Sequence, residues 1–197
     1  QAGIARFDGH RFTAFTPETA PALPGTYINA LLADDQGTVW VGTYKGMAGW
    51  REGGFFAVPV AGDAASGPNI QALARSPQGE VLAAAGNTVF SVRDDALHPH
   101  LQLDQPARAL LAEGVDLWIG SVGGIYLRQA DAAPQFQPFP DDARTAATRV
   151  LLRANGLLWA GTSEGLMVLQ GDRWQRHLGE AGLSHTPIEA MLRDRDG

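Results

Sequence analysis

The sequence predicts an all-β protein built as a β-propeller, and three observations support this fold class. The stretch 38–47, TVWVGTYKGM, returns as EVLAAAGNTV, DLWIGSVGGI and LLWAGTSEGL, with Leu82 replacing tryptophan in the weakest copy. The copies follow one another at intervals of 42, 36 and 41 residues, a period typical of propeller arrays. The 197 residues include 24 glycines and 12 prolines and are only 18% charged, as expected for a soluble globular protein dense in turns.

Composition also excludes several classes of function. The net charge is −6 and the 15 lysines and arginines form no basic run, which argues against a nucleic-acid partner. The chain has no cysteine, so disulfides and thiolate metal sites are excluded. It has no apolar run long enough for a membrane helix and no leader-like N-terminus. We therefore expect membrane attachment only through segments outside this chain.

Residues 1–16 match the second half of a repeat. Gly3 and Ile4 correspond to Gly46 and Met47, and an aromatic residue follows eight positions after each apolar residue. Asp-Gly or Gly-Gly lies between them, and these residues accept the positive φ of tight hairpins. The pairs at 94–95 and 171–172 predict the same turn. In the third copy the aromatic residue is delayed to Phe136, which predicts a longer loop there.

Five apolar segments begin at Ile28, Ile70, Ala107, Thr148 and Ile188. Apolar and polar residues alternate in them over four to six positions, which favours strands over helices. DDQG at 34–37 and SPQG at 76–79 close the first two as turns. Each segment therefore begins a new repeat.

The repeat unit is predicted to have four strands, at 28–33, 38–43, 47–51 and 55–59, followed by a linker. The second strand is apolar on both faces, as expected for a blade between two neighbours. The buried indole of Trp40 needs a partner for its N–H, and Gly42 is expected to make room for the adjoining blade. We expect a positive φ at the glycine of the next turn. The structural repeat residues are Trp40, Gly42, Gly46, Trp118, Gly120, Gly124, Trp159, Gly161 and Gly165.

The blade boundaries follow from these strands. We expect a half blade at 1–16, blades at 26–60, 106–139 and 147–178, a degenerate blade at 68–101, and the start of another at 187–197. This gives four complete four-stranded antiparallel blades and a fifth split between the termini. A closed five-bladed ring is one interpretation. A fragment of a longer propeller is favoured, because a split blade without its second strand would leave unpaired edges.

W-x-G-T-x-x-G, preceded by a strand ending in Asp-x-x-Gly, resembles the two-component regulator propeller repeat of bacterial sensor proteins. The resemblance is strongest at 26–60 and 147–178, and poorest at 68–101, where Trp, Gly and Thr are missing. It implies a periplasmic sensor region of an inner-membrane protein, ahead of a histidine kinase or diguanylate cyclase domain outside this chain. WD40 and kelch arrays fit less well, because the sequence has neither a Trp-Asp strand ending nor a Gly-Gly pair at a period of about 50.

Candidate ligand-binding residues lie where the repeat places its loops. In a four-stranded blade, the linkers between blades and the turns between second and third strands share one face. Loops on a rigid scaffold commonly carry function. We expect ligand contacts from Tyr44, Lys45, Asn69, Asn87, Ser121, Arg144, Ser163, Glu164 and His185.

The sequence predicts no catalytic residue, no cofactor and no metal. His98 and His100 have no third ligand nearby in sequence. Residues 194–197 begin like a calcium loop, yet they align with the turn at Asp34, so we predict a turn. Glu164 and Asp142 could be drawn as a carboxylate pair, but nothing fixes their distance. No Gly-x-Ser-x-Gly or phosphate loop occurs.

Three functional hypotheses remain. The favoured one is an extracytoplasmic sensor module that binds a small polar ligand such as an oligosaccharide, or acts through self-association, and passes a signal to an output domain. It rests on the resemblance, since a fold alone does not specify function. The alternatives are a propeller enzyme, such as a polysaccharide lyase or glycosidase, and a passive scaffold.

Overall fold

The computed structural model describes residues 3–62, 67–177 and 185–193. It contains four four-stranded antiparallel sheets, one two-stranded hairpin and a single 3₁₀ turn, η1 (Asp141–Ala143). The prediction of an all-β protein made of four-stranded propeller blades is confirmed. The chain divides into two compact units, Gln1–Gln102 and Leu103–Gly197, which are described separately below.

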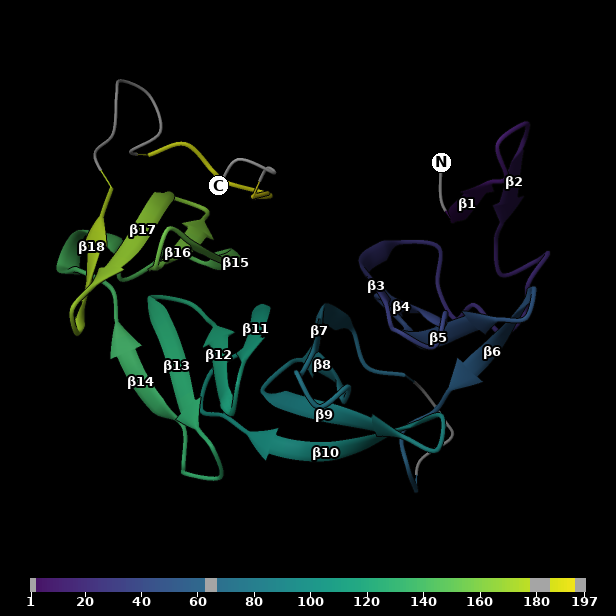
Figure 1. The fold of residues 1–197 in the computed structure, drawn as a ribbon, viewed down its shortest axis with the longest axis horizontal. Coiled ribbons are helices and arrows are strands. Elements are labelled where there is room, and N and C mark those ends of the chain that lie inside the picture. Colours follow the sequence, from purple (N-terminus) through teal and green to yellow (C-terminus); the bar gives the residue numbers. More distant parts are fainter. Residues whose placement is uncertain (1–2, 63–66, 178–184, 194–197) are drawn as a thin grey trace. The chain divides into compact units, whose positions relative to one another are not determined.

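The first unit holds a hairpin and two blades (Figure 1). The hairpin is β1 (Ile4–Phe7) with β2 (Phe12–Phe15). Blade 1 comprises β3 (Ile28–Ala33), β4 (Val39–Thr43), β5 (Gly46–Arg51) and β6 (Gly54–Val58). Blade 2 comprises β7 (Ile70–Arg75), β8 (Val81–Ala85), β9 (Thr88–Arg93) and β10 (Ala96–Gln102). Each strand pairs with the next along the chain, so a blade is a simple meander.

The second unit repeats this arrangement. Blade 3 comprises β11 (Ala109–Glu113), β12 (Asp116–Gly120), β13 (Gly124–Gln129) and β14 (Gln135–Pro138). Blade 4 comprises β15 (Thr148–Ala154), β16 (Leu157–Thr162), β17 (Gly165–Gln170) and β18 (Arg173–Arg176). Figure 1 shows both blades in green, with the first strands β11 and β15 turned toward each other.

The segment beginning at Ile188 does not form the predicted strand; the described residues 185–193 contain none. Ile188 N donates to the Thr162 carbonyl oxygen at 2.9 Å, but one bond of this kind does not make a strand ladder. The Ile188 side chain nevertheless packs on Gly161, where the next first strand would lie. The turn predicted at 194–197 lies outside the described residues.

The hairpin turn at 94–95 lies where the sequence predicts it, the turn predicted at 53–54 lies one residue earlier, and the pair at 8–9 belongs to a longer loop, 8–11. Glu52 and Gly53 connect β5 to β6 with φ of 52° and 86°, and Asp94 and Asp95 connect β9 to β10 with φ of 50° and 55°. Two successive positive φ values are those of type I′ turns, whose twist matches that of paired strands. In blade 3, residues 130–134 form the longer loop expected before Phe136.

The cores lie between the blades. In the first unit, Trp40, Met47 and Val58 of blade 1 pack against Ile70, Val81, Phe90 and Leu97 of blade 2. In the second unit, Trp118 and Ile125 of blade 3 pack against Leu158, Met167 and Trp174 of blade 4. Burial of both faces explains why the second strands are apolar throughout and do not alternate.

The glycines two residues after the tryptophans make room for the next blade, as predicted. A Cβ on Gly42 would lie 2.6 Å from Ile70 Cγ2, and one on Gly120 would lie 2.4 Å from Thr148 Cγ2. Ile70 and Thr148 occupy the same position in the first strands of blades 2 and 4. A side chain on either glycine would therefore push two blades apart.

The glycines at the following turn divide into two kinds. Gly46 and Gly165 have φ of 131° and 113°, which confirms the prediction of positive φ. The prediction was wrong for Gly124, because Gly123 takes the positive φ of 69° in blade 3. Gly124 is required for packing instead, since its Cβ would lie 2.4 Å from the Gln137 carbonyl oxygen.

Candidate functional site

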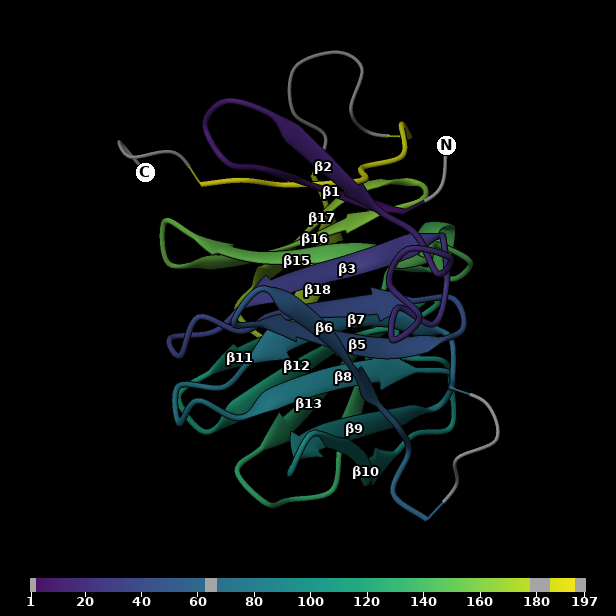
Figure 2. The same cartoon turned by 90° about the vertical axis from the view of Figure 1, so that its right-hand side faces the viewer.

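One end of the strands in each unit carries the turns between second and third strands and the linkers between blades. Because neighbouring strands run antiparallel, the first and third turns of every blade lie at the other end. Figure 2 shows the strands crossing the view with turns at both ends. We call the first end the linker face and the second the hairpin face, in each unit separately. All nine predicted ligand-binding residues lie in loops of the linker face.

Buried threonines set the turns of this face. Thr43 is buried, and its hydroxyl donates to the Gly46 carbonyl oxygen at 3.0 Å and accepts from Lys45 N at 3.1 Å. Thr162 makes the same two bonds, to Gly165 and Glu164, at 2.8 and 3.1 Å. The bonds close each turn from inside. Tyr44 and Lys45 of the first turn are exposed, whereas Ser163 and Glu164 of the second are half-buried.

The linker face of the first unit carries an aromatic pair. The rings of Tyr27 and Tyr44 meet edge to face with centroids 5.4 Å apart, and Lys45 Nζ lies 5.2 Å from the Tyr44 centroid. Tyr27 is 67% exposed and Tyr44 37%. An exposed aromatic pair with a cation beside it offers an apolar stacking surface with polar groups at its edge.

Asn29 follows Tyr27 by two residues and brings an amide next to this pair in sequence. Asn29 Nδ2 donates to Asn69 Oδ1 and to the Ile70 carbonyl oxygen, both at 2.9 Å. Asn29 is the extra residue of a bulge in β3, since the register shifts between Ile28 and Ala30. Bulges re-aim side chains, and Asn29 consequently reaches blade 2. Asn87 lies in the β8–β9 turn of the same face.

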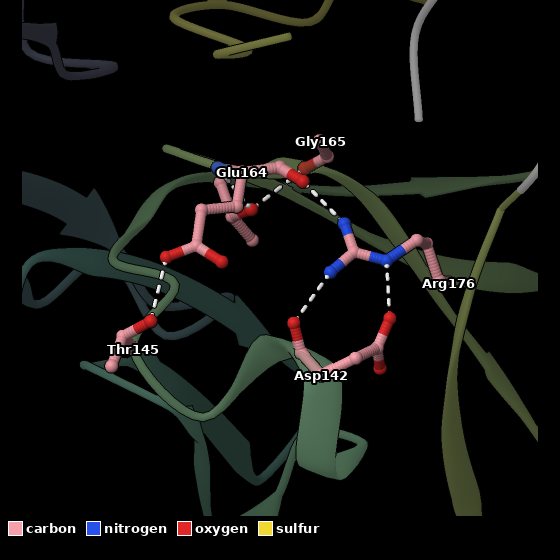
Figure 3. A network of polar contacts seen from close by, with 6 residues as sticks. Asp142, Thr145, Glu164, Gly165 and Arg176 are labelled. Carbon is pink, nitrogen blue, oxygen red and sulfur yellow. Dashed lines mark hydrogen bonds and ion pairs between the residues drawn. The ribbon is translucent and has the colours of Figure 1, made fainter. Parts of the chain in front are cut away.

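The linker face of the second unit is organised by Arg176, a residue of β18 (Figure 3). Its side chain is only 6% exposed. The guanidinium donates to Asp142 Oδ2 at 2.9 Å, to the Asp142 carbonyl oxygen at 3.0 Å and to the Glu164 carbonyl oxygen. One arginine therefore joins the linker before blade 4 to the β16–β17 turn.

Glu164 is held in this network from both sides. Its carboxylate accepts from Thr145 Oγ1 at 2.8 Å, while Arg176 holds its backbone (Figure 3). Arg149, the bulge residue of β15, pairs with Glu189 at 2.6 Å. The sequence analysis did not include Arg176, Arg149 or Asn29 among the candidates, because their partners lie 34 to 41 residues away along the chain.

The remaining predicted residues differ in access. Ser121 is fully buried and its hydroxyl donates to the Pro106 carbonyl oxygen at 2.9 Å. Its placement among the ligand contacts is therefore corrected, because a buried hydroxyl that holds a linker is closed to a ligand. Ser163 Oγ accepts from Ala147 N at 2.9 Å. Arg144 pairs with Asp141 at 2.9 Å in an exposed position, and His185 is exposed in the linker after β18.

The hairpin face of the first unit has a charged groove of about 270 Å³ between blades 1 and 2. Two of its acids are paired across the two blades: Asp35 with Arg75 of blade 2, and Asp95 with Arg51 of blade 1. In the second unit Arg153 of blade 4 pairs with Glu113 of blade 3 at 2.7 Å. Arg75 and Arg153 lie in first strands, whereas Arg51 ends the third strand of blade 1.

Asp34 in the same groove is a structural acid. Its carboxylate accepts from Trp40 Nε1 at 2.8 Å and from the backbone N of Gln36 and Thr38, both at 2.9 Å. Burial acts to raise the pKa of Asp34, but these hydrogen bonds outweigh it and hold the pKa below its ordinary value. A general acid needs a raised pKa, so Asp34 fits a turn anchor and not a proton donor.

The described part of the chain contains no group of three histidine, aspartate or glutamate side chains placed to hold a metal ion. Its helical content includes nothing long and apolar enough to cross a membrane.

Part of the chain matches the sequence model of a known repeat family. Residues 22–45 match the sequence model of the two-component regulator propeller. This confirms the resemblance drawn from Trp40 and its neighbours. Comparison with curated proteins gives no match.

Solved structures share the fold. The extracellular domain of a hybrid two-component system from B. thetaiotaomicron aligns over 98% of this chain with a TM-score of 0.75 and 17% identity. That of a second such system aligns over 89% with a TM-score of 0.72 and 19% identity. The chain spans only 28% and 27% of those two domains.

Virginiamycin B lyase from Staphylococcus aureus also has this fold. It aligns over 81% of this chain and 58% of its own length, with a TM-score of 0.64 and 15% identity. The TM-scores establish a common fold, while the identities are low. They leave function to be argued from the residues.

Proposed function

We propose that this chain, which carries the two-component regulator propeller repeat, is part of an extracytoplasmic recognition module of a bacterial sensor protein and does not itself catalyse a reaction. The likeness to extracellular domains of hybrid two-component systems supports this location and role. The output domain would be a histidine kinase or diguanylate cyclase elsewhere in the protein.

The observation that carries the proposal is the preorganised linker face. Thr43 and Thr162 fix two turns from inside, and Arg176 fixes a third loop to one of those turns. Rigid loops that present Tyr44, Lys45 and Glu164 lose little entropy on binding. In the first unit, the aromatic pair of Tyr27 and Tyr44 beside Lys45 suits a small polar ligand, with an oligosaccharide as the first choice.

A thermal-shift screen with soluble oligosaccharides tests the ligand. We expect at least one compound to raise the melting midpoint, and Tyr44→Ala to reduce that rise by half or more. Gln36→Ala, an exposed residue of the hairpin face, is the matched control and should leave the rise unchanged. A flat response of the unaltered chain across the panel would count against direct ligand recognition.

Self-association is the second branch of the proposal. Light scattering after size exclusion gives the oligomeric state, and a concentration-dependent dimer would support signalling through dimer geometry. The enzyme alternative has one supporting observation, the fold shared with virginiamycin B lyase. It would replace the proposal if one of the oligosaccharides were cleaved by the purified chain and the cleavage were lost in Glu164→Gln.

A further inference from the structure

An apolar groove of about 250 Å³ lies between the β1–β2 hairpin and blade 1. Its apolar walls come from both sides: Ile4 and Phe15 from the hairpin, and Leu31, Val39, Trp50 and Phe55 from blade 1. Leu31 is 56% exposed although it lies in a first strand. An apolar groove of this kind needs an occupant.

The register of the strands identifies what each groove residue corresponds to in the next interface. Ile4 and Phe15 pair with each other as Met47 and Val58 do. Leu31, Val39, Trp50 and Phe55 occupy the positions that Leu73, Val81, Val92 and Leu97 occupy in blade 2.

All six of these counterparts belong to one cluster, and that cluster surrounds Trp40. The second unit repeats the arrangement, because Trp118 lies in a cluster with Leu151, Leu158, Leu169 and Trp174, which hold the same four positions in blade 4. The groove is therefore lined like the two sites that hold Trp40 and Trp118.

The backbone at Gly3 also fits a tryptophan-bearing strand beside the groove. Gly3 has a φ of 129°, close to the 131° of Gly46 and the 113° of Gly165. Gly46 and Gly165 each follow the turn that leads out of a tryptophan-bearing second strand. Among the described strands β1 pairs only with β2, so its other edge is open to such a strand.

We infer that the groove is the seat of a tryptophan on a β-strand of the repeat's own second-strand pattern, which enters directly ahead of the turn at Gly3 and pairs antiparallel with β1. The strand would set its glycine against Ile28, as Gly42 is set against Ile70. One position differs from the other interfaces, because Arg6 lies where blade 1 has Gly49. Its guanidinium carbon already lies 5.7 Å from the Trp50 ring centroid, so it can also lie against the incoming indole.

A short fusion tests this inference on the whole chain. The six residues TVWVGT, a copy of 38–43, are placed directly before Gln1, which reproduces the Thr-x-x-Gly spacing of Thr43 and Gly46. The reference fusion, TVAVGT, differs only in the tryptophan. We expect the tryptophan fusion to melt on the order of 5–10 °C higher, since seating a large aromatic side chain stabilises strongly in a chain of this size.

Groove variants locate the effect. Leu31→Arg should abolish the difference between the two fusions, whereas Val115→Arg, at an exposed apolar residue outside the groove, should leave it intact. If Leu31→Arg does not fold, amide exchange at residues 4–7 decides, with at least tenfold slower exchange expected in the tryptophan fusion. Equal melting of the two fusions, a difference that survives Leu31→Arg in a folded chain, or unchanged exchange would overturn the inference. None of these readouts depends on a ligand, so the proposed function is tested separately.

Discussion

Blades 1 and 2 have the same architecture but very different repeat sequences. Both place a bulge in the first strand, between Ile28 and Ala30 and between Ile70 and Ala72. Both close the next turn with equivalent backbone bonds, Gly37 N to the Asp34 carbonyl oxygen and Gly79 N to that of Ser76. Yet blade 2 has neither the tryptophan nor the glycine of the repeat.

The difference separates the residues that form the sheet of a blade from those that tie its second strand to the preceding turn. Leu82 and the alanines of β8 are fully enclosed, so apolar residues of modest size are enough to form the sheet. Trp40 adds a bond from its indole to Asp34, which ties the second strand to the preceding turn. In blade 2 the turn is tied by Ser76 Oγ, which accepts from Glu80 N at 3.1 Å.

The sharpest way to break this comparison is Trp40→Leu, which gives blade 1 the residue of blade 2. We expect a loss of about 3 kcal/mol in unfolding free energy, from the cavity and from the unpaired oxygen of Asp34. Urea denaturation measures it, with Leu82→Met as a volume-conserving control at less than about 1.5 kcal/mol. A loss below about 1 kcal/mol would mean that leucine serves equally well in both blades.

Gly42→Ala is expected to have the next largest effect. The added methyl would lie 2.6 Å from Ile70 Cγ2, so we expect a loss of about 2 kcal/mol from overpacking. The double variant with Ile70→Ala, which removes Cγ2, should lose less than the sum of the two single changes, since the two side chains contact. The reverse change in blade 2, Ala84→Gly, should cost only about 1 kcal/mol through backbone entropy. Equal losses at both positions would contradict the assignment of Gly42 to blade spacing.

Asp34→Asn tests the hydrogen bond between the Trp40 indole and the Asp34 carboxylate without removing the tryptophan. At pH 7 we expect a loss of about 1.5 kcal/mol, typical of a bond to a charged acceptor. Because the pKa of Asp34 is lowered in the folded chain, the stability it contributes is present above the ordinary carboxyl pKa and is lost as the pH falls through the folded value. The gap between the two proteins should therefore shrink as the pH is lowered from about 5 to about 3. Ser76→Ala is the control, and its effect should not change over this range.

The smallest effect is expected to be a gain. Thr148 stands where blades 1 and 2 have Ile28 and Ile70, and its buried hydroxyl has no hydrogen-bond partner among the described residues. Thr148→Val should add about 1 kcal/mol to the unfolding free energy, because it removes an unsatisfied buried group without changing the shape. Thr162→Val, which removes a hydroxyl with two bonds, should instead destabilise. A loss in Thr148→Val would show that its hydroxyl is satisfied in solution.

The sequence was sufficient for the features that depend on neighbours along the chain. Hairpin turns such as Asp94 with Asp95, the two-sided burial of the second strand and the position of Gly42 all follow from local pattern. Each results from φ preferences, from the two-residue period of a strand or from a repeated gap, which short stretches of sequence reveal.

The features that failed or were missed depend on contacts and backbone angles that the repeat pattern alone does not reveal. Ser121 is as buried as its threonine counterparts, and its hydroxyl bonds to the linker at Pro106. Gly124 has a glycine neighbour that takes the positive φ in its place. Arg176 looks like an ordinary polar residue of a fourth strand until the linker carrying Asp142 folds over it. The ligand-binding set stays a prediction for this reason.

The ion pairs made by arginines at the ends of first strands occur only in every second blade described, in blades 2 and 4. The end of the first strand reads Ala33, Arg75, Ala112 and Arg153 in successive blades, and each arginine reaches back to the acid of the blade before it. The smallest segment that keeps each of these arginines together with its acid is therefore a pair of blades. A graft or recombination joint at residues 102–103 would transfer intact pairs, whereas a joint one blade away would strand an arginine without its acid.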